Sequence, residues 1–300
     1  MYSKDIKINK EHLSNHSFAI IVNKDAKNAQ NVDQYLDEFS QANLSYQLHQ
    51  VNSNNIEEKI RESAQKYPFL IVGGGDGTMR TAAHYCAGSK IVLGILPLGT
   101  LNHFSKEFNL PQNPKDMIRC IHEFKTTTID LASVNGKIFV NNSSIGIYPK
   151  FAKLRDEYAK KYNKWISYFP SLIEVLKKHD VFESRIKSAS LNSHIISPFL
   201  MISNNIYCFE FPLTFKRDEL TRGLLGLYYV QHGKIGLLRL INILFGKENN
   251  FIFKEVGDSL EIDFPKRSTI RVSLDGDWEE MKPPLYYQIL PQSLRVLVMS

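Results

Sequence analysis

The sequence has little that would tie it to a secreted or disulfide-stabilised protein. Only three of its 300 residues are cysteine, and these (Cys86, Cys120 and Cys208) lie too far apart for a metal-ligand spacing or a disulfide framework. The N-terminus lacks a basic stretch followed by an apolar core, so we expect no signal peptide. Low cysteine use of this kind is typical of a reducing compartment, and we expect a cytoplasmic location.

Long apolar runs and concentrated charge are also missing. No apolar run approaches the roughly 18 residues that a membrane-spanning helix needs, so we expect any lipid contact to come from the membrane surface. The net charge of +6 is spread along the chain. This charge favours anionic partners such as nucleotides or acidic headgroups, but without a Lys/Arg block it does not indicate nucleic-acid binding.

The N-terminal part of the chain alternates between short apolar runs and amphipathic segments. Apolar runs at residues 18–22, 69–72 and 91–96 are typical of strands buried on both faces, and a further strand is expected at 44–51. Helices are expected over residues 31–43, 56–66, 78–87, 102–108 and 114–124. This alternation predicts a doubly wound α/β domain with a parallel sheet.

Two glycine-bearing turns follow strands of this domain. The segment Gly74-Gly75-Asp76-Gly77-Thr78 follows residues 69–72, and Pro97-Leu98-Gly99-Thr100-Leu101-Asn102 follows residues 91–96. Glycine lets backbone N–H groups approach phosphate oxygens, and a helix that starts just afterwards adds unpaired donors. Asp76 would repel phosphate unless a divalent cation lay between them, although aspartate is also a preferred helix N-cap. The turns therefore predict a nucleotide site for metal-assisted phosphoryl transfer.

The pattern changes near residue 126, where short strands joined by turn residues begin. They are expected at residues 128–134, 137–141, 199–203, 224–230, 251–255, 260–264, 269–274, 285–290 and 294–299. We therefore predict an α/β domain over 1–126 and an all-β, sandwich-like domain over 127–300. Helical insertions at 150–180 and 234–246 would interrupt the second domain, and their apolar faces either pack on it or lie on a membrane.

In series, these motifs resemble the diacylglycerol kinase catalytic-domain family, bacterial lipid kinases related to sphingosine and ceramide kinases. The resemblance rests on the two glycine turns, on Leu274-Asp275-Gly276-Asp277, and on Ile129-Asp130-Leu131 and the segment 139–146 at the start of the second domain. It covers nearly the whole chain. It implies a nucleotide-binding domain related to NAD kinases and phosphofructokinases, a β-sandwich lipid domain, and an active site in the cleft between them.

The resemblance also implies roles for individual residues. It implies ATP and Mg²⁺ as cofactors and transfer of the γ-phosphate to a lipid hydroxyl at the membrane surface, a step in phospholipid metabolism. Asp76 would orient the metal–phosphate assembly, and Asp277 would act as general base. The other nucleotide contacts would be Asn23, Gly74, Gly75, Gly77, Thr78, Gly99, Thr100 and Asn102. Family members are often dimers, so a homodimer is left open.

Some positions depart from the family pattern. The loop after the first strand contains Lys24 in place of the usual proline, His103 stands where aspartate is common, and Asp277 stands where glutamate is usual. Asp275-Gly276 is by itself a hairpin-turn signal. Two other functions stay open: a kinase of a soluble substrate such as NAD, and a nucleotide- or lipid-binding protein with weakened catalysis. The turn Pro97–Asn102 favours the lipid branch over NAD kinases.

A metal-ligand set is not assigned from the sequence. Asp130, Asp218 and Glu219 are candidates for a second, structural cation site, because hard cations favour carboxylate and carbonyl oxygens. A solvated acidic loop explains Asp218 and Glu219 equally well. These three residues are therefore alternatives rather than a predicted site.

Overall fold

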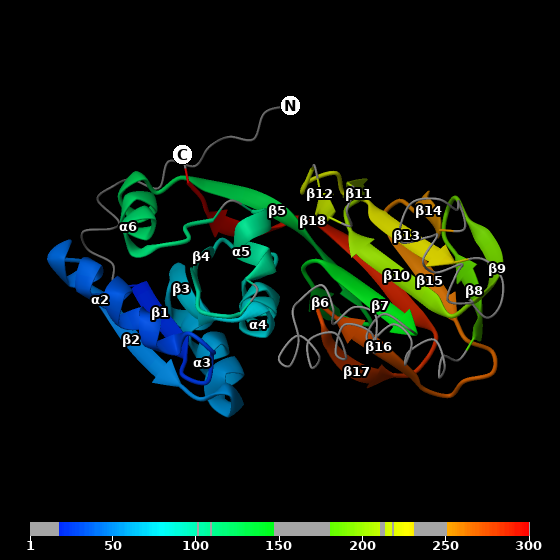
Figure 1. Cartoon of the computed structure of the whole chain (residues 1–300), viewed down its shortest axis with the longest axis horizontal. Helices are drawn as coiled ribbons and strands as arrows, with labels where there is room; N and C mark the ends of the chain where they lie inside the picture. Colours follow the sequence, from blue (N-terminus) through cyan, green and yellow to red (C-terminus); the bar gives the residue numbers. More distant parts are fainter. Residues whose placement is uncertain are drawn as a thin grey trace, which may run out of the picture. The chain divides into compact units, whose positions relative to one another are not determined.

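The computed structural model describes residues 18–100, 102–108, 110–146, 181–210, 214–217, 219–230 and 251–299 (Figure 1). The chain separates into two compact units. The first unit comprises the chain up to Thr128 together with the C-terminal segment from Leu294. The second unit is Ile129–Ser293. The sequence places the boundary close by, at residue 126. It also places residues 294–299 in the second domain, whereas the first unit of the structure includes the chain from Leu294 onward.

The sheet of the first unit runs in the order β2-β1-β3-β4, with the end of β18 (Leu285–Leu297) next to β4. Neighbouring strands pair in parallel, and β1 and β3 are buried along their whole length. The prediction of an α/β fold with parallel strands is therefore confirmed. The strands are β1 (Phe18–Asn23), β2 (Tyr46–Val51), β3 (Phe69–Gly74) and β4 (Val92–Pro97).

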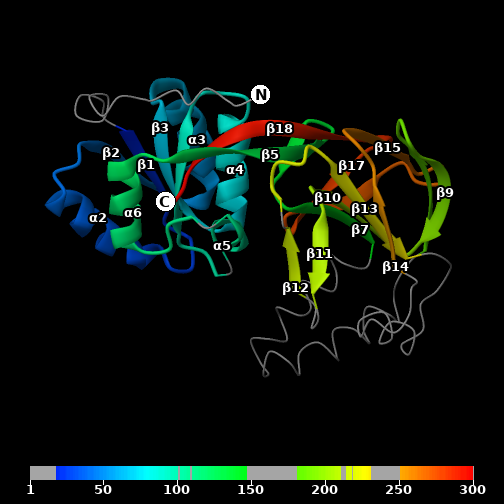
Figure 2. The same cartoon turned by 90° about the horizontal axis from the view of Figure 1, so that it is seen from above.

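Helices cover both faces of this sheet (Figure 2). On one face, Phe39 of α2 and Met117 of α6 share a core with Ile71 of β3. Helices α3 and α4 contact β1 and β3 from the other face. The helical elements are η1 (Ala29–Asn31), α2 (Val32–Gln41), α3 (Ser53–Lys66), α4 (Asp76–Cys86), α5 (His103–Glu107) and α6 (Pro114–Glu123).

The second unit consists of antiparallel strands. One sheet has the order β14-β13-β10-β7-β16-β17, the other joins β5, β6, β8, β9 and β15 to β18, and β11 and β12 form a hairpin. The bounds are β5 (Thr126–Val134), β6 (Lys137–Phe139), β7 (Asn142–Gly146), β8 (Phe182–Lys187), β9 (Asn192–Ser197), β10 (Phe199–Asn204), β11 (Tyr207–Glu210), β12 (Thr214–Arg217), β13 (Leu225–Val230), β14 (Phe251–Glu255), β15 (Ser259–Asp263), β16 (Ile270–Leu274), β17 (Asp277–Met281) and β18 (Leu285–Leu297).

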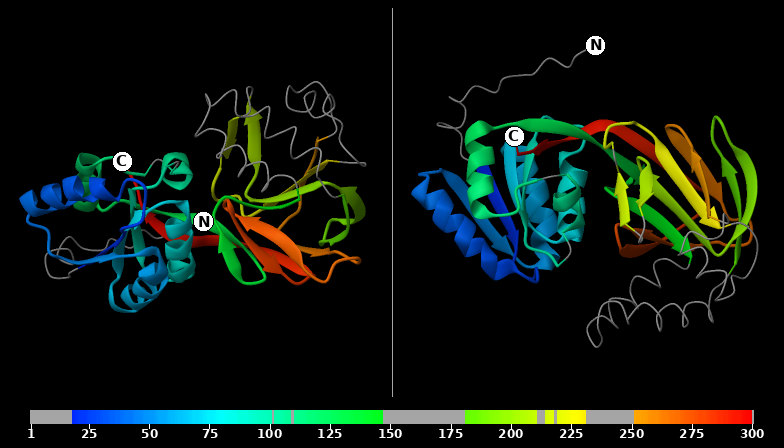
Figure 3. Two further views of the ribbon diagram at one scale, coloured as in Figure 1. Left: turned by 60° about the horizontal axis from the view of Figure 1, so that its bottom comes forward. Right: turned by 45° about the horizontal axis from the view of Figure 1, so that its top comes forward.

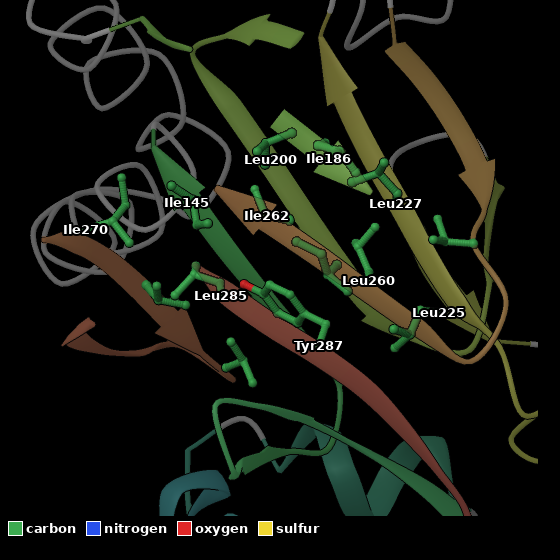
Figure 4. Packing of buried hydrophobic residues seen from close by; sticks show 14 of the residues in the cluster. Ile145, Ile186, Leu200, Leu225, Leu227, Leu260, Ile262, Ile270, Leu285 and Tyr287 are labelled. Atoms are coloured by element: carbon green, nitrogen blue, oxygen red, sulfur yellow. The ribbon is translucent and has the colours of Figure 1, made fainter. Parts of the chain in front are cut away.

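The two larger sheets of this unit share one hydrophobic core (Figure 4). Buried side chains from both sheets line it, among them Ile145, Leu200, Leu227, Leu260, Ile262, Leu285 and Tyr287. A shared core of this kind is what a sandwich-like domain requires. The helical insertions expected at 150–180 and 234–246 fall in ranges outside the described residues. Within the described ranges, no helix has the length and apolarity needed to cross a bilayer.

Strand β18 is one strand of 13 residues, where the sequence predicts two (Figure 3). The sequence ends one expected strand at residue 290 and begins the next at 294, and Gln292 between them has a positive φ of 48°. Its N–H donates to Oδ1 of Asp130 at 2.7 Å. The buried Asp130 carboxylate thus supplies a partner for a backbone donor at the irregular point of the strand.

Candidate functional site

Strand β3 leads directly into α4 at the first glycine turn. Gly74 is the last residue of β3, Gly75 is the N-cap, and Asp76 is the first residue of α4. The reading of Asp76 as an N-cap is therefore wrong. The first turn of a helix carries backbone N–H groups without a partner in the helix, at the positive end of its dipole. Gly74 also has a steric role, because a Cβ there would lie 2.6 Å from the Thr78 side chain.

The second turn folds around the peptide groups of Gly99. Its N–H donates to Asn102 Oδ1 at 2.8 Å, and its carbonyl accepts from Asn102 Nδ2 at 3.1 Å. Asn102 has a φ of 50° and begins the turn into α5, a left-handed conformation that asparagine tolerates. Because both polar backbone groups of Gly99 are engaged inside the protein, this glycine shapes the turn. Thr100 is exposed.

The two turns contact each other. A Cβ on Gly99 would lie only 2.6 Å from Gly75 Cα, so the two backbones approach closely. The Phe104 N–H, in the helix after the second turn, lies 3.4 Å from Asp76 Oδ1. The structure therefore brings together the two motifs that the sequence places after neighbouring strands. That they bind a nucleotide stays a prediction.

Asn23, at the end of β1, joins the first turn. Its Nδ2 donates to Thr78 Oγ1 at 3.2 Å, and its Oδ1 accepts from Ser53 Oγ at 3.2 Å and from the Asp25 N–H at 3.0 Å. Asn23 and Thr78 are both buried. Two side chains that the sequence predicts as nucleotide contacts thus lie in hydrogen-bond contact.

Asp25 is a residue that the sequence analysis missed. Its Oδ2 accepts from the Ser53 N–H at 2.7 Å, at the first turn of α3. Hydrogen bonding by Ser53 lowers the pKa of Asp25. The carboxylate therefore fixes the loop after β1 to α3. An acidic residue that accepts from the start of a distant helix leaves no local pattern in the sequence.

Asp277 lies in the second unit, in the hairpin between β16 and β17. It is the first residue of β17, is exposed, and pairs with Leu274. Asp275 and Gly276 between them have positive φ values of 50° and 103°. The hairpin turn that Asp-Gly indicates in the sequence is confirmed. The role of Asp277 as a general base stays a prediction.

The Asp275 carboxylate accepts three backbone hydrogen bonds. Oδ2 accepts from the Val140 N–H at 2.8 Å, and Oδ1 accepts from the N–H groups of Asn141 and Asn142 at 2.7 and 3.1 Å. These bonds tie the hairpin to the start of β7. The sequence signals a turn at Asp275 but not these bonds, because their donors lie 133 to 135 positions earlier in the chain.

The Asp130 carboxylate is buried and engaged with protein donors. Oδ1 accepts from Gln292, and Oδ2 accepts from the Gly223 N–H at 2.8 Å and from Asn205 Nδ2 at 3.1 Å. Of the other candidates for a structural cation site, Glu219 places its Oε2 3.9 Å from Arg222 Nε. Asp218 falls outside the described residues. Within the part of the chain that the structure describes, no group of three or more His, Cys, Asp and Glu residues could hold a metal.

Comparison with known proteins agrees with this architecture. Residues 17–134 match the family model described as the diacylglycerol kinase catalytic domain. A protein of Pseudomonas aeruginosa named "Probable lipid kinase YegS-like" is 37% identical over 108 residues, which cover 35% of this chain and 34% of the relative. A "Diacylglycerol kinase" of Staphylococcus saprophyticus is 34% identical over 91 residues, 30% of each chain. These matches thus span about a third of each relative's length.

A solved structure extends the likeness in fold to nearly the whole chain. The crystal structure of a diacylglycerol kinase from Bacillus anthracis superposes with a TM-score of 0.68, covering 94% of this chain and 96% of that one. Its sequence identity of 20% shows a shared fold only. The resemblance inferred from the motifs is confirmed by the family match. Over residues 17–134, this chain is similar to the diacylglycerol kinase catalytic domain family.

Proposed function

We propose that this chain is a Mg²⁺- and ATP-dependent lipid kinase, which transfers the γ-phosphate of ATP to the hydroxyl of diacylglycerol or a similar lipid. The observation that carries the proposal is the contact between the turns at Gly75 and Gly99, inside a domain of the diacylglycerol kinase catalytic family. The names of the relatives from Pseudomonas and Staphylococcus support a lipid as acceptor.

The first turn fits a nucleotide phosphate. Gly75 carries no Cβ, and α4 starts immediately after it and runs for 11 residues. Backbone N–H groups at the start of such a helix bind phosphate oxygens, and the helix dipole favours their charge. In this proposal Asn23 holds Thr78 through the 3.2 Å bond between their side chains, which keeps the first turn of α4 in place.

Asp76 fits a divalent cation. Its carboxylate is half-buried in the first turn of α4, beside the proposed phosphate site. Mg²⁺ in proteins is commonly held by one or two carboxylates together with substrate phosphates, so a larger ligand cluster is not required. Asp76 would hold Mg²⁺ in this way. A bound Mg²⁺ neutralises charge on the transferred phosphoryl group.

Asp277 is proposed as the general base. As the lipid hydroxyl oxygen bonds to the γ-phosphorus, the bond to the β–γ bridging oxygen breaks and ADP leaves. The hydroxyl proton moves to the Asp277 carboxylate. Asp275 supports this role by fixing the hairpin that carries Asp277 through three backbone hydrogen bonds. We further propose that the protein meets its lipid at the cytoplasmic face of a membrane.

The test is transfer of radiolabelled γ-phosphate from Mg²⁺-ATP to a panel of lipids in mixed micelles. Diacylglycerol, a sphingoid base, a ceramide and phosphatidylglycerol form the panel, and NAD is the soluble control. We expect label on a lipid, separated by thin-layer chromatography. Label on NAD instead would indicate that the chain is a kinase of a soluble substrate. ATP binding without label on any acceptor would favour a nucleotide-binding protein with weakened catalysis.

A further inference from the structure

The loop after β1 is held by local hydrogen bonds to Asn23 and by contacts with distant parts of the fold. Residues 24–28 contain neither proline nor glycine. Ordering a flexible loop around a ligand costs conformational entropy, which lowers affinity. This loop nevertheless begins next to Asn23, which contacts Thr78 of the first glycine turn. Contacts with distant parts of the fold add to the local hydrogen bonds that hold this loop in place.

Asn28 makes such a contact with the second glycine turn. Its backbone N–H donates to the Leu98 carbonyl at 3.0 Å, and its Nδ2 donates to the Gly99 carbonyl at 2.8 Å, across 71 positions of sequence. In the sheet order β2-β1-β3-β4, strands β1 and β4 lie on either side of β3. The link from the loop after β1 to the turn after β4 therefore encloses the end of β3, where the first glycine turn begins.

Gly99 connects Asn28 to the first glycine turn. Its carbonyl accepts from the side-chain amides of both Asn28 and Asn102. Its Cα packs against Gly75, the N-cap of α4, so closely that a Cβ would not fit. A shift of the Gly99 peptide would therefore change the spacing between the two turns. Of the two side chains that clamp this peptide, only Asn102 belongs to a recognised motif.

We propose that Asn28 is a positioning residue for the nucleotide. It holds the second turn against the first, so that the N–H groups at the start of α4 meet phosphate in a preformed geometry. The inference rests on the proposed use of ATP at this site. Asn28 acts through Gly99 and not by contact with a reacting atom. A preformed site avoids the ordering cost that a loose loop would carry.

The test compares nucleotide binding by full-length variants, using a fluorescent ATP analogue with Mg²⁺. Asn28→Ala should weaken binding about three- to ten-fold, the change expected for one net hydrogen bond. Asn28→Asp keeps the size of the side chain but removes the Nδ2 donor. Its loss of affinity for the ATP analogue should be at least as large as that of Asn28→Ala. Asn55→Ala, at an exposed asparagine of α3, is the matched control and should bind as the wild type does.

A second readout separates positioning from a general structural role. In the transfer assay, the Asn28 variants should raise the KM for ATP by the same factor while the KM for the lipid stays unchanged. Wild-type affinity in both Asn28 variants would overturn the inference and leave nucleotide binding standing. A parallel rise in both KM values would also contradict it. Absence of binding by the wild type would remove the proposed function, and this inference with it.

Discussion

Gly75 and Gly99 face each other across the two glycine turns, and only one of the two positions has room for a side chain. A Cβ on Gly75 would lie 3.5 Å from Gly99 Cα, an ordinary van der Waals contact. A Cβ on Gly99 would lie 2.6 Å from Gly75 Cα and 2.7 Å from Asn102 Oδ1. Although both glycines belong to sequence motifs, only at Gly99 does the close approach of the two turns exclude a Cβ.

This asymmetry predicts different effects of alanine at the two positions. Gly99→Ala should lower the free energy of unfolding by about 1–3 kcal/mol, the usual range for overpacking, because the backbone must shift. Gly75→Ala is the matched control and should change it by less than about 1 kcal/mol, since its φ of −93° suits alanine. Urea unfolding measures the change in the free energy of unfolding for both variants. Equal losses in the two variants would contradict the close approach at Gly99.

Asp275 should matter for stability. Asp275→Ala removes the acceptor of three backbone N–H groups and should lower the free energy of unfolding by about 2–4 kcal/mol. Asp277→Ala, two positions along the same hairpin, replaces an exposed side chain and should cost less than about 1 kcal/mol. Urea unfolding compares the two. An Asp275→Ala variant as stable as the wild type would show that these bonds do not hold the hairpin.

Asp277 should matter for the chemical step. Asp277→Asn keeps the shape but cannot accept the hydroxyl proton, so kcat should fall about 100-fold or more while the KM for ATP is unchanged. Asp277→Glu should retain or raise activity. Glu280→Gln, an exposed carboxylate on the same strand, is the control and should be neutral. Full activity of Asp277→Asn in the lipid phosphorylation assay would mean that another group is the base.

Cys86 should be unreactive in the folded protein. The side chain is fully buried, and burial raises its pKa to about 12. Because the thiolate is the reactive form, alkylation should stay slow as the pH rises from about 7 to about 9, a range in which an exposed cysteine becomes much more reactive. Peptide mass spectrometry after iodoacetamide treatment, with and without urea, measures this. Rapid labelling of Cys86 without urea would contradict its burial in α4.

Much of the first unit could be predicted from local sequence patterns. Buried parallel strands read as continuous apolar runs, so β1 and β3 were found close to their observed bounds. The position of both glycine turns after neighbouring strands was also correct. Hydrogen bonds between side chains and distant backbone were not predictable. Asn28 contacts Gly99 across 71 positions, and no residue near Asn28 in the sequence signals that contact.

The second unit was harder because its strands depart from apolar patterns. Strand β7 (Asn142–Gly146) is largely small and polar, and β17 (Asp277–Met281) is a charged strand at a sheet edge. Neither was expected as a strand. In β18, the sequence predicts two strands, 285–290 and 294–299, but the structure has one, and the Asp130 carboxylate accepts a hydrogen bond from Gln292 at its irregular point. A buried carboxylate that stabilises a strand 162 positions away cannot be inferred from one sequence.

The most direct measurement is the initial rate of lipid phosphorylation by the wild type, Asp76→Ala and Asp116→Ala. Asp76 and Asp116 are each an acidic residue in the first turn of a helix, so their replacement perturbs the helix dipole alike. We predict that Asp116→Ala retains wild-type activity, whereas Asp76→Ala remains folded and loses at least about 100-fold. Near-normal turnover by Asp76→Ala, or no labelled lipid with the wild type, would contradict a lipid kinase site at the first glycine turn.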